Sequence, residues 1–140
     1  MVVTNVDEEI EPMKRILIIE DVDFNRDLLI QLLEENYSLL IATDGAAGIA
    51  MAGSEHPDLI IMDLSLPIVD GWTATRRIKA DPLLHDIPIL ALSSHAMRGD
   101  EEKARQCGCD DYLSKPLDED RLFEKVQQLL KKSPNPALLP

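Results

Sequence analysis

The chain has 140 residues, of which 45% are hydrophobic and 4% aromatic, and its formal net charge at pH 7 is −12. This length supports one domain with a full hydrophobic core and is too short for two. The acidity argues against nucleic acid as a partner, because phosphate backbones recruit clusters of Lys and Arg. The sequence offers only pairs, such as Arg76-Arg77 and Lys131-Lys132.

The sequence has no feature of secretion or membrane insertion. Its N-terminus lacks a basic region followed by an apolar run, as in a signal peptide. No stretch approaches the roughly 20 apolar residues that a membrane-spanning helix needs. Cys107 and Cys109 are separated by one glycine, which does not suggest a disulfide, and no second Cys or His pair exists to complete a zinc site. We therefore expect a cytoplasmic protein with no membrane partner.

Short aliphatic runs alternate with amphipathic stretches along the whole chain. The aliphatic runs predict strands, and apolar residues at helical spacing predict helices. The expected strands are 15–19, 39–42, 58–62, 87–92 and 111–113. The expected helices are 23–33, 45–55, 72–80, 99–106 and 118–131.

The first helix has a predicted cap and a predicted buried face. Asp23 is the expected N-cap. The residues expected on the buried face are Phe24, Leu28, Leu29, Leu32 and Leu33.

Five βα units in about 120 residues predict an α/β fold with three layers. We expect a doubly wound, five-stranded parallel sheet of the flavodoxin-like type with strand order 2-1-3-4-5, covered by helices on both faces. The continuous aliphatic character of 58–62 suits a central strand. Residues 14–132 are the expected folded domain, between a flexible acidic leader (1–13) and a flexible Pro-rich tail (133–140).

Polar residues stand at or near the C-terminal ends of four of these strands. They are Glu20-Asp21, Asp63, Ser93 and Lys115. In an open parallel sheet that edge is where ligands bind. If the first and third strands are neighbours, three carboxylates converge, and at neutral pH they need protonation or a cation. Oxygen ligands without a nearby His or Cys favour Mg2+, with Mn2+ also suitable.

The same residues could handle a phosphoryl group. Lys115 adds a positive charge and Ser93 a hydroxyl donor, which together with a cation would neutralise a phosphoryl group in transfer. A carboxylate can itself be the nucleophile and form an acyl phosphate, and Asp63 is the best placed. An acidic pair after a strand is by itself more often a capping turn, and a lone lysine more often a surface residue. Their joint occurrence favours the phosphate site.

These motifs closely resemble the receiver domain of two-component response regulators. The resemblance rests on Ile-Ile-Glu-Asp, Ile-Met-Asp-Leu-Ser-Leu-Pro, Asp70-Gly71, Ala-Leu-Ser-Ser-His-Ala-Met and Asp-Tyr-Leu-Ser-Lys-Pro, in this order. It runs from about Lys14 to Leu130. The stretch from His95 to Asp100 is most similar to single-domain receivers and to receivers of hybrid histidine kinases.

The resemblance implies a role for each site residue. Asp63 would accept a phosphoryl group from a histidine kinase or a histidine phosphotransfer protein. Ser93 and Lys115 would contact the phosphoryl oxygens, and the Lys115-Pro116 peptide bond would be cis. The implied ligands of Mg2+ are Glu20, Asp21, Asp63 and the backbone carbonyl of Ser65.

The resemblance also implies how the signal leaves the site. Tyr112 matches an aromatic switch residue that turns inward when Ser93 moves toward the phosphate. The changed surface would be the face of the fourth helix, fifth strand and fifth helix. Few residues follow the last expected helix, so we expect no output domain and a signal carried by protein contacts. The downstream target is unknown, and the expected state is a monomer or weak homodimer.

Three positions depart from the commoner pattern. Glu20 stands where Asp is also common, Ser93 where Thr is commoner, and Ser94 where a small residue, usually Ala, is found.

Three alternative interpretations stay open. A phosphohydrolase would typically carry a second Asp at the position of Ser65, which counts against that enzyme class. A phosphorylation-independent docking module would be expected to have lost Asp21, Asp63 or Lys115, and all three are present. The chain could also be a receiver fragment of a hybrid histidine kinase.

Overall fold

The computed structural model describes residues 12–94 and 99–132, and in them the chain forms five strands and five helices. The strands are β1 (Arg15–Ile19), β2 (Ser38–Ala42), β3 (Leu59–Asp63), β4 (Ile89–Ser93) and β5 (Asp111–Ser114). The helices are α2 (Asp23–Leu33), α3 (Gly45–Glu55), α4 (Gly71–Ala80), α5 (Asp100–Cys107) and α6 (Glu119–Lys132). Most of the predicted leader and all of the predicted tail lie outside the described residues, so their flexibility stays a prediction.

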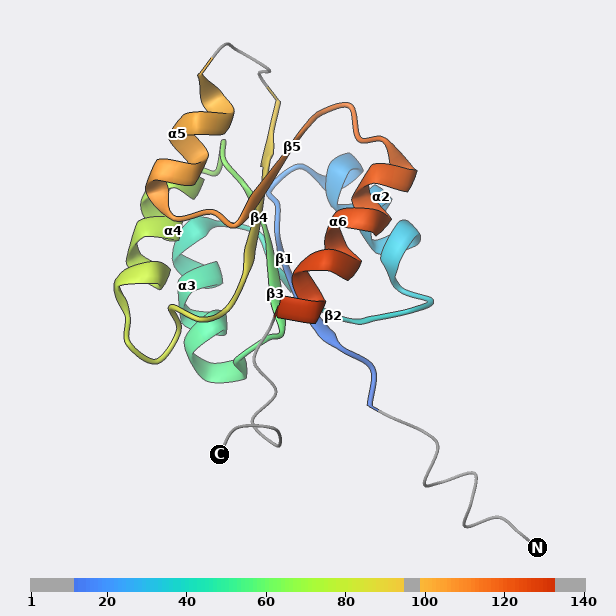
Figure 1. Ribbon diagram of the computed structural model, residues 1–140, viewed down its shortest axis with the longest axis horizontal. Coiled ribbons are helices and arrows are strands. Elements are labelled where there is room, and N and C mark those ends of the chain that lie inside the picture. The colour runs from blue at the N-terminus through green and yellow to red at the C-terminus, as the bar shows by residue number, and fades with distance from the viewer. Residues whose placement is uncertain (1–11, 95–98, 133–140) are drawn as a thin grey trace, which may run out of the picture.

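The strands form one parallel sheet in the order β2-β1-β3-β4-β5, which confirms the predicted fold class and strand order. Helices α3, α4 and α5 cover one face of the sheet, and α2 and α6 cover the other (Figure 1). All residues of β3 and β4 are buried, because helices lie on both sides of these strands. The aliphatic runs in the sequence follow from this double burial.

Alternate residues of each central strand serve two separate cores. In β1, Leu17 and Ile19 pack with α3 and α4, whereas Ile16 and Ile18 pack with α2 and α6. Successive side chains of a strand point to opposite faces, so one five-residue run contributes to both layers. The sheet is thereby fixed from both sides, and its C-terminal edge becomes a rigid support.

Four strands differ from their prediction by one or two residues at an end, and the differences in β3 and β4 concern site residues. β3 extends to Asp63 and β4 to Ser93, so these side chains belong to the sheet itself. β4 begins at Ile89 instead of residue 87, because Pro88 has no N–H to donate to a neighbouring strand. The Pro88 carbonyl still accepts a hydrogen bond from the Ile60 N–H at 3.0 Å.

Two predictions for α2 are wrong. The N-cap is Val22, and Asp23 is the first helical residue, where it forms an ion pair with Arg26. Phe24 is 75% exposed, although it was expected in the core. A helix turns by about 100° per residue, so Phe24 lies half a turn around the axis from Leu33. The buried residues of α2 are Leu29 and Leu33.

Close backbone contacts at two glycines hold the loop that follows β3. A Cβ atom on Gly71 would lie 2.3 Å from the backbone oxygen of Asp63 and 2.5 Å from the Cα of Leu64. A Cβ atom on Gly45 would lie 1.9 Å from the backbone oxygen of Val69. Only glycine lets the first residues of α3 and α4 approach this loop so closely. The two contacts fix the backbone on which Asp63 stands.

Gly71→Ala should lower the free energy of unfolding by about 2 to 3 kcal/mol, since the added methyl group must displace backbone atoms. Urea unfolding followed by circular dichroism measures this change. Gly53→Ala is the matched control, because nothing lies within 4 Å of a Cβ atom at that position in α3. The control should gain up to about 1 kcal/mol from helix propensity. Equal effects of the two substitutions would contradict the close contact.

Candidate functional site

Three carboxylates meet at the C-terminal edge of the sheet. Glu20 and Asp21 follow β1, and Asp63 ends the neighbouring strand β3. Each of the three offers an oxygen within 4.8 Å of the others. Glu20 is fully buried, Asp63 is 2% exposed, and Asp21 is half-buried. The sheet order therefore brings together the acidic residues that were predicted to form one site.

Lys115, the residue directly after β5, is the cation of this cluster. Its Nζ lies 2.8 Å from Oε1 of Glu20 and 3.8 Å from Oδ1 of Asp63. The Lys115 N–H donates to the Ser93 carbonyl at 2.8 Å, which ties the loop after β5 to the end of β4. The Lys115-Pro116 peptide bond is cis, as expected. Buried charges need such partners to offset their loss of hydration.

Glu20 is held as a carboxylate. Burial alone would raise its pKa, but the hydrogen bond from Lys115, the neighbouring Asp63 carboxyl and the Val22 N–H together hold it below the ordinary value. The Val22 N–H donates to Oε2 of Glu20 at 3.2 Å. Arg26, which the sequence analysis did not single out, donates to the Glu20 carbonyl at 3.2 Å and to the Asp21 carbonyl at 3.4 Å. Arg26 lies in the first turn of α2, close in sequence to Glu20 and Asp21, and this proximity could have identified it as a contact of the acidic pair.

The pKa of Asp63 is shifted in the opposite direction to that of Glu20. Burial and the adjacent Glu20 carboxylate raise the pKa of Asp63 from its ordinary 3.8 to about 7, against the opposing effects of Lys115 and of the Ser65 N–H. The Ser65 N–H donates to Oδ1 of Asp63 at 3.1 Å. Two carboxylates served by one lysine leave the cluster short of positive charge. A divalent cation would supply that charge, and three carboxylate oxygens suit Mg2+.

Ser93 ends β4, the strand next to β3, and Tyr112 lies in β5, the strand next to β4. Ser93 is 4% exposed, and its hydroxyl donates to Oδ2 of Asp100, in the first turn of α5, at 3.2 Å. Tyr112 is half-buried against the core on the α3–α5 side of the sheet. Asp100 was quoted in the sequence only as part of a motif, and no spacing rule would have paired it with Ser93.

An apolar hollow of about 160 Å³ opens beside Glu20 and Lys115. It lies between the start of α2 and the loop after β5. Its remaining lining residues are Phe24, Asn25, Leu28, Leu29, Pro116 and Leu117. Phe24 is thus exposed at the edge of a hollow that borders the acidic cluster.

Comparisons with known proteins agree with this geometry. The family described as "Response regulator receiver domain" matches residues 16–127. The polar-differentiation response regulator DivK of Brucella ovis is 39% identical over 118 residues, which cover 84% of this chain and 96% of DivK. The chain belongs to the response regulator receiver domain family. It is a receiver of two-component signalling, and such domains interact with histidine kinases or phosphotransfer proteins.

Solved receiver structures share the fold over most of the chain. The receiver domain of a sensor histidine kinase from Pseudomonas aeruginosa PAO1 has a TM-score of 0.79 and 33% identity, covering 85% of this chain and 98% of that one. That protein has a magnesium ion coordinated in its active site cleft. The receiver domain of a histidine kinase from Syntrophus aciditrophicus has a TM-score of 0.81 and 30% identity, covering 91% and 97%.

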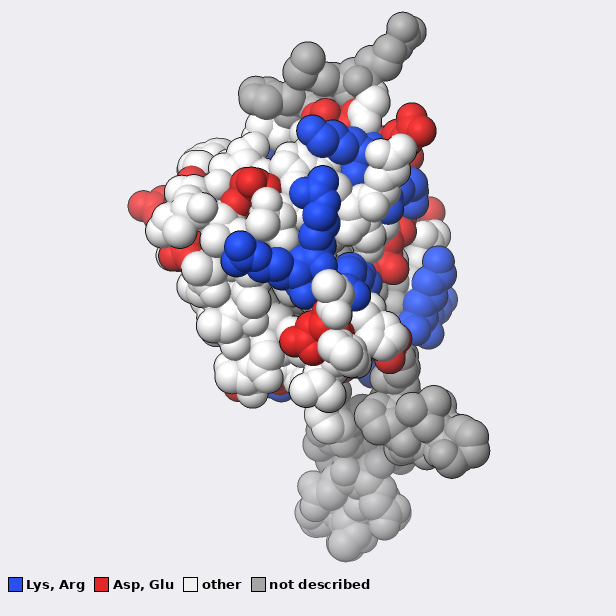
Figure 2. Space-filling model, turned by 90° about the vertical axis from the view of Figure 1, so that its left-hand side faces the viewer, with Lys and Arg blue, Asp and Glu red and all other residues white. Residues whose placement is uncertain are grey.

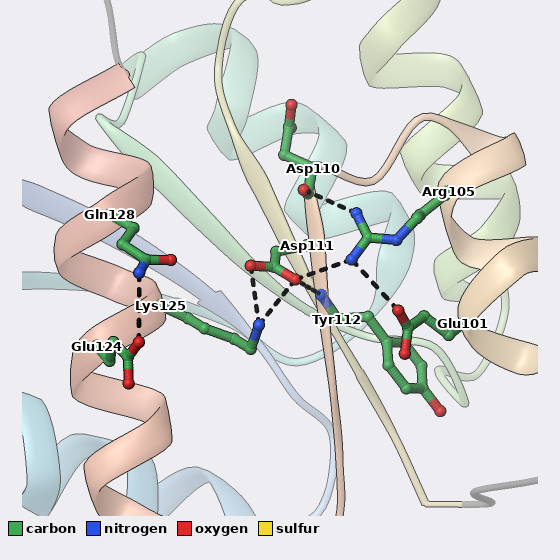
Figure 3. Close-up of polar contacts among 8 residues, drawn as sticks. All are labelled: Glu101, Arg105, Asp110, Asp111, Tyr112, Glu124, Lys125 and Gln128. Atoms are coloured by element: carbon green, nitrogen blue, oxygen red, sulfur yellow. Dashed lines mark hydrogen bonds and ion pairs between the residues drawn. The ribbon is translucent and has the colours of Figure 1, made fainter.

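The receiver carries a charged network across α5, β5 and α6 (Figure 3). Asp111 at the start of β5 accepts two hydrogen bonds from Lys125 of α6, each at 3.0 Å, and one from Arg105 of α5 at 3.2 Å. Arg105 also pairs with Glu101 of its own helix at 3.4 Å. Burial raises the pKa of Asp111, but Lys125 and the other donors reverse this and hold it below the ordinary value. These contacts join the two helices on either side of the edge strand.

The surface charge of the receiver is uneven despite its net charge of −12. Figure 2 shows Lys and Arg side chains gathered in a band on the side formed by α4 and α5. The two helices contribute Arg76, Arg77, Lys79, Lys103 and Arg105. Lys103 lies 5.0 Å above the ring of Trp72, and Lys79 pairs with Asp110. Folding thus assembles a basic band from residues that are only isolated cations and pairs in the sequence.

Neither cysteine belongs to the site. Cys107 and Cys109 are buried and free. Burial raises the pKa of Cys109 to about 11, so its thiol is protonated at neutral pH. In the described residues, 12–94 and 99–132, no helix has the length and apolar character needed to span a membrane.

Asp63→Asn should stabilise the receiver in the absence of divalent cations, and more at about pH 8 than at about pH 5.5. The folded state keeps a proton on Asp63 up to about pH 7, whereas the unfolded chain loses it near the ordinary value of 3.8. Stability is therefore lost as the pH rises through this interval, and the amide avoids that loss. Thermal unfolding in EDTA should show a rise in Tm of about 5 °C at the higher pH. A gain that is equal or larger at the lower pH would contradict the raised pKa.

Proposed function

We propose that this receiver accepts a phosphoryl group on Asp63 from the phosphohistidine of a histidine kinase or histidine phosphotransfer protein. The observation that carries the proposal is the placement of Asp63 within 4.8 Å of Glu20 and Asp21 and 3.8 Å from the Lys115 ammonium. Its other carboxylate neighbour, Glu20, already pairs with Lys115. Asp63 is thus a buried carboxylate in a cluster where three carboxylates share one lysine and could hold a divalent cation.

The chemistry follows from these neighbours. An ionised Asp63 oxygen attacks the phosphorus, the P–N bond breaks, and the imidazole nitrogen leaves with the electron pair. Glu20, Asp21, Asp63 and the Ser65 carbonyl would hold Mg2+, or Mn2+ in its place, which supplies charge neutralisation for the incoming phosphoryl oxygens. Lys115 and the Ser93 hydroxyl would bind those oxygens. Hydrolysis of the acyl phosphate returns the free carboxylate.

We further propose that the signal leaves through the α5-β5-α6 face. Ser93 ends β4 and Tyr112 lies in the neighbouring strand β5, and α5 and β5 also share the Arg105–Asp111 contact. A docking module without a phosphorylation switch remains the alternative, and phosphorylation by a small phosphodonor separates the two.

A cytoplasmic location belongs to the same proposal and is supported by the free cysteines. Oligomeric state stays a prediction of monomer or weak homodimer.

Incubation with acetyl phosphate and Mg2+ should add one phosphoryl group, read by intact mass. Asp63→Ala should add none, because the nucleophile is gone. Asp86→Ala, which removes an exposed carboxylate before β4, is the matched control and should behave as wild type. EDTA should abolish the gain, and Mn2+ should restore it. An unmodified wild-type chain, under conditions that preserve acyl phosphates, would favour the docking module.

The apolar hollow beside the site is the proposed contact for the phosphodonor protein. A donor histidine must reach Asp63, so the donor must cover the surface around the cluster. Val22 and Phe24, which are 46% and 75% exposed, lie at the start of α2 on this surface. Burying such side chains against a partner is favourable, at about 25 cal/mol per Å².

Phe24→Ser should leave phosphorylation by acetyl phosphate unchanged, because the side chain lies outside the acidic cluster. Transfer from a phosphorylated histidine phosphotransfer protein should slow by about 10-fold, as expected for loss of one aromatic anchor. Leu83→Ser is the matched control, since Leu83 is 78% exposed in the segment between α4 and β4. Equal slowing by both substitutions would contradict this docking surface.

A further inference from the structure

The Ser93 hydroxyl is engaged away from the acidic cluster in this structure. It donates to Oδ2 of Asp100 at 3.2 Å, and Ser93 itself is 4% exposed. The Ser93 backbone cannot follow a change of partner, because its carbonyl accepts the Lys115 N–H and β4 is fully buried. Only rotation of the side chain can redirect the hydroxyl.

A serine hydroxyl carries one proton and so donates one hydrogen bond at a time. An ionised carboxylate is a strong acceptor, and a hydrogen bond to it is stronger than one to a neutral group. A phosphoryl group on Asp63 would present a second anionic acceptor to the same proton. The Asp100 carboxylate and the phosphoryl oxygens therefore compete for the Ser93 hydroxyl.

Helix α5 is the element that this competition can move. It has eight residues, and those that it buries are Ala104 and Cys107. Its other side-chain contacts are polar and exposed, such as the Arg105–Glu101 pair and Lys103 over the Trp72 ring. An element with few buried apolar contacts opens at low free energy. The Ser93–Asp100 hydrogen bond connects its first turn to the rigid end of β4.

We propose that Asp100 is a positioning residue that holds Ser93 and the first turn of α5 in the unphosphorylated arrangement, and that it gives up the hydroxyl when Asp63 is phosphorylated. This inference rests on the proposed function, since it requires Ser93 to bind the phosphoryl group. Loss of the Asp100 contact frees the N-terminus of α5. Through Arg105 and Asp111 that change reaches the α5-β5-α6 face shown in Figure 3.

The test measures the affinity of the full chain for beryllofluoride, a stable phosphoryl mimic, in the presence of Mg2+. Titration is followed by the fluorescence of Trp72, and by calorimetry for each variant. Asp100→Ala should lower the apparent Kd by about 3- to 10-fold, as expected when one competing hydrogen bond is removed. Asp100→Asn, which keeps an acceptor oxygen, should lie between Asp100→Ala and wild type.

A double-mutant cycle separates this contact from a general loss of negative charge. If Asp100 acts through the Ser93 hydroxyl, Asp100→Ala should change the Kd by less than about 1.5-fold in a Ser93→Ala background. Glu102→Ala is the charge control, because it removes an exposed carboxylate from the same helical turn, and its Kd should match wild type. Circular dichroism melts confirm that each variant is folded.

The outcomes distinguish the two proposals. If the wild-type chain fails to bind beryllofluoride, the proposed function falls and this inference falls with it. If wild type binds but Asp100→Ala binds equally well, only the role of Asp100 is overturned. The same conclusion follows if Asp100→Ala tightens binding as much in the Ser93→Ala background, or if Glu102→Ala tightens it equally.

Discussion

The parallel pairing of β1 and β3 places three carboxylates at one edge of the sheet, and the surrounding structure compensates for their repulsion. Lys115, which follows the edge strand β5, extends to the cluster and pairs with Glu20 at 2.8 Å. The N–H groups of Val22 and Ser65 supply further donors. Burial and the adjacent Glu20 carboxylate still raise the pKa of Asp63, and three carboxylates with one lysine make the cluster suitable for Mg2+.

The fold keeps this unfavourable arrangement rigid. Asp63 is the last residue of a fully buried strand, so its backbone cannot move to expose the carboxylate to solvent, as the backbone of a loop residue could. The loop after it is held by the close approach of α3 and α4 at Gly45 and Gly71. Asp44 and Asp70 cap these two helices by accepting hydrogen bonds from the backbone N–H groups of Ala47 and Thr73. Packing on both faces of the sheet therefore keeps the three carboxylates close together despite their mutual repulsion.

The side of the molecule that faces β5 is organised in a different way. There α5 and α6 also meet the edge strand through polar contacts, with Asp111 accepting from Arg105 and Lys125, in addition to the apolar packing of Leu113 with α6. Such contacts are partly exposed, and their net contribution to stability is small compared with that of buried apolar packing. A rigid acidic site next to a lightly held helix is an arrangement in which a change of charge at Asp63 can be transmitted to a surface.

The sequence by itself determined the strand and helix alternation, the fold class and the identity of the acidic residues. These were predictable because double burial produces aliphatic runs and because ligands bind where parallel strands end. Single helix positions were less secure: Asp23 was wrongly taken as the N-cap and Phe24 as a core residue. The N-cap depends on the geometry of the loop before α2, whereas the exposure of Phe24 follows from its position half a turn from Leu33 and was open to prediction from helical periodicity.

Only the tertiary structure decided which charged groups touch. The pairing of Lys115 with Glu20, separated by 95 positions, follows from the sheet order and from side-chain reach. The contact between Ser93 and Asp100, the Arg105–Asp111–Lys125 network and the basic band of α4 and α5 likewise join residues from different elements. Sequence spacing carries periodicity along one element, whereas these contacts depend on how elements pack against one another.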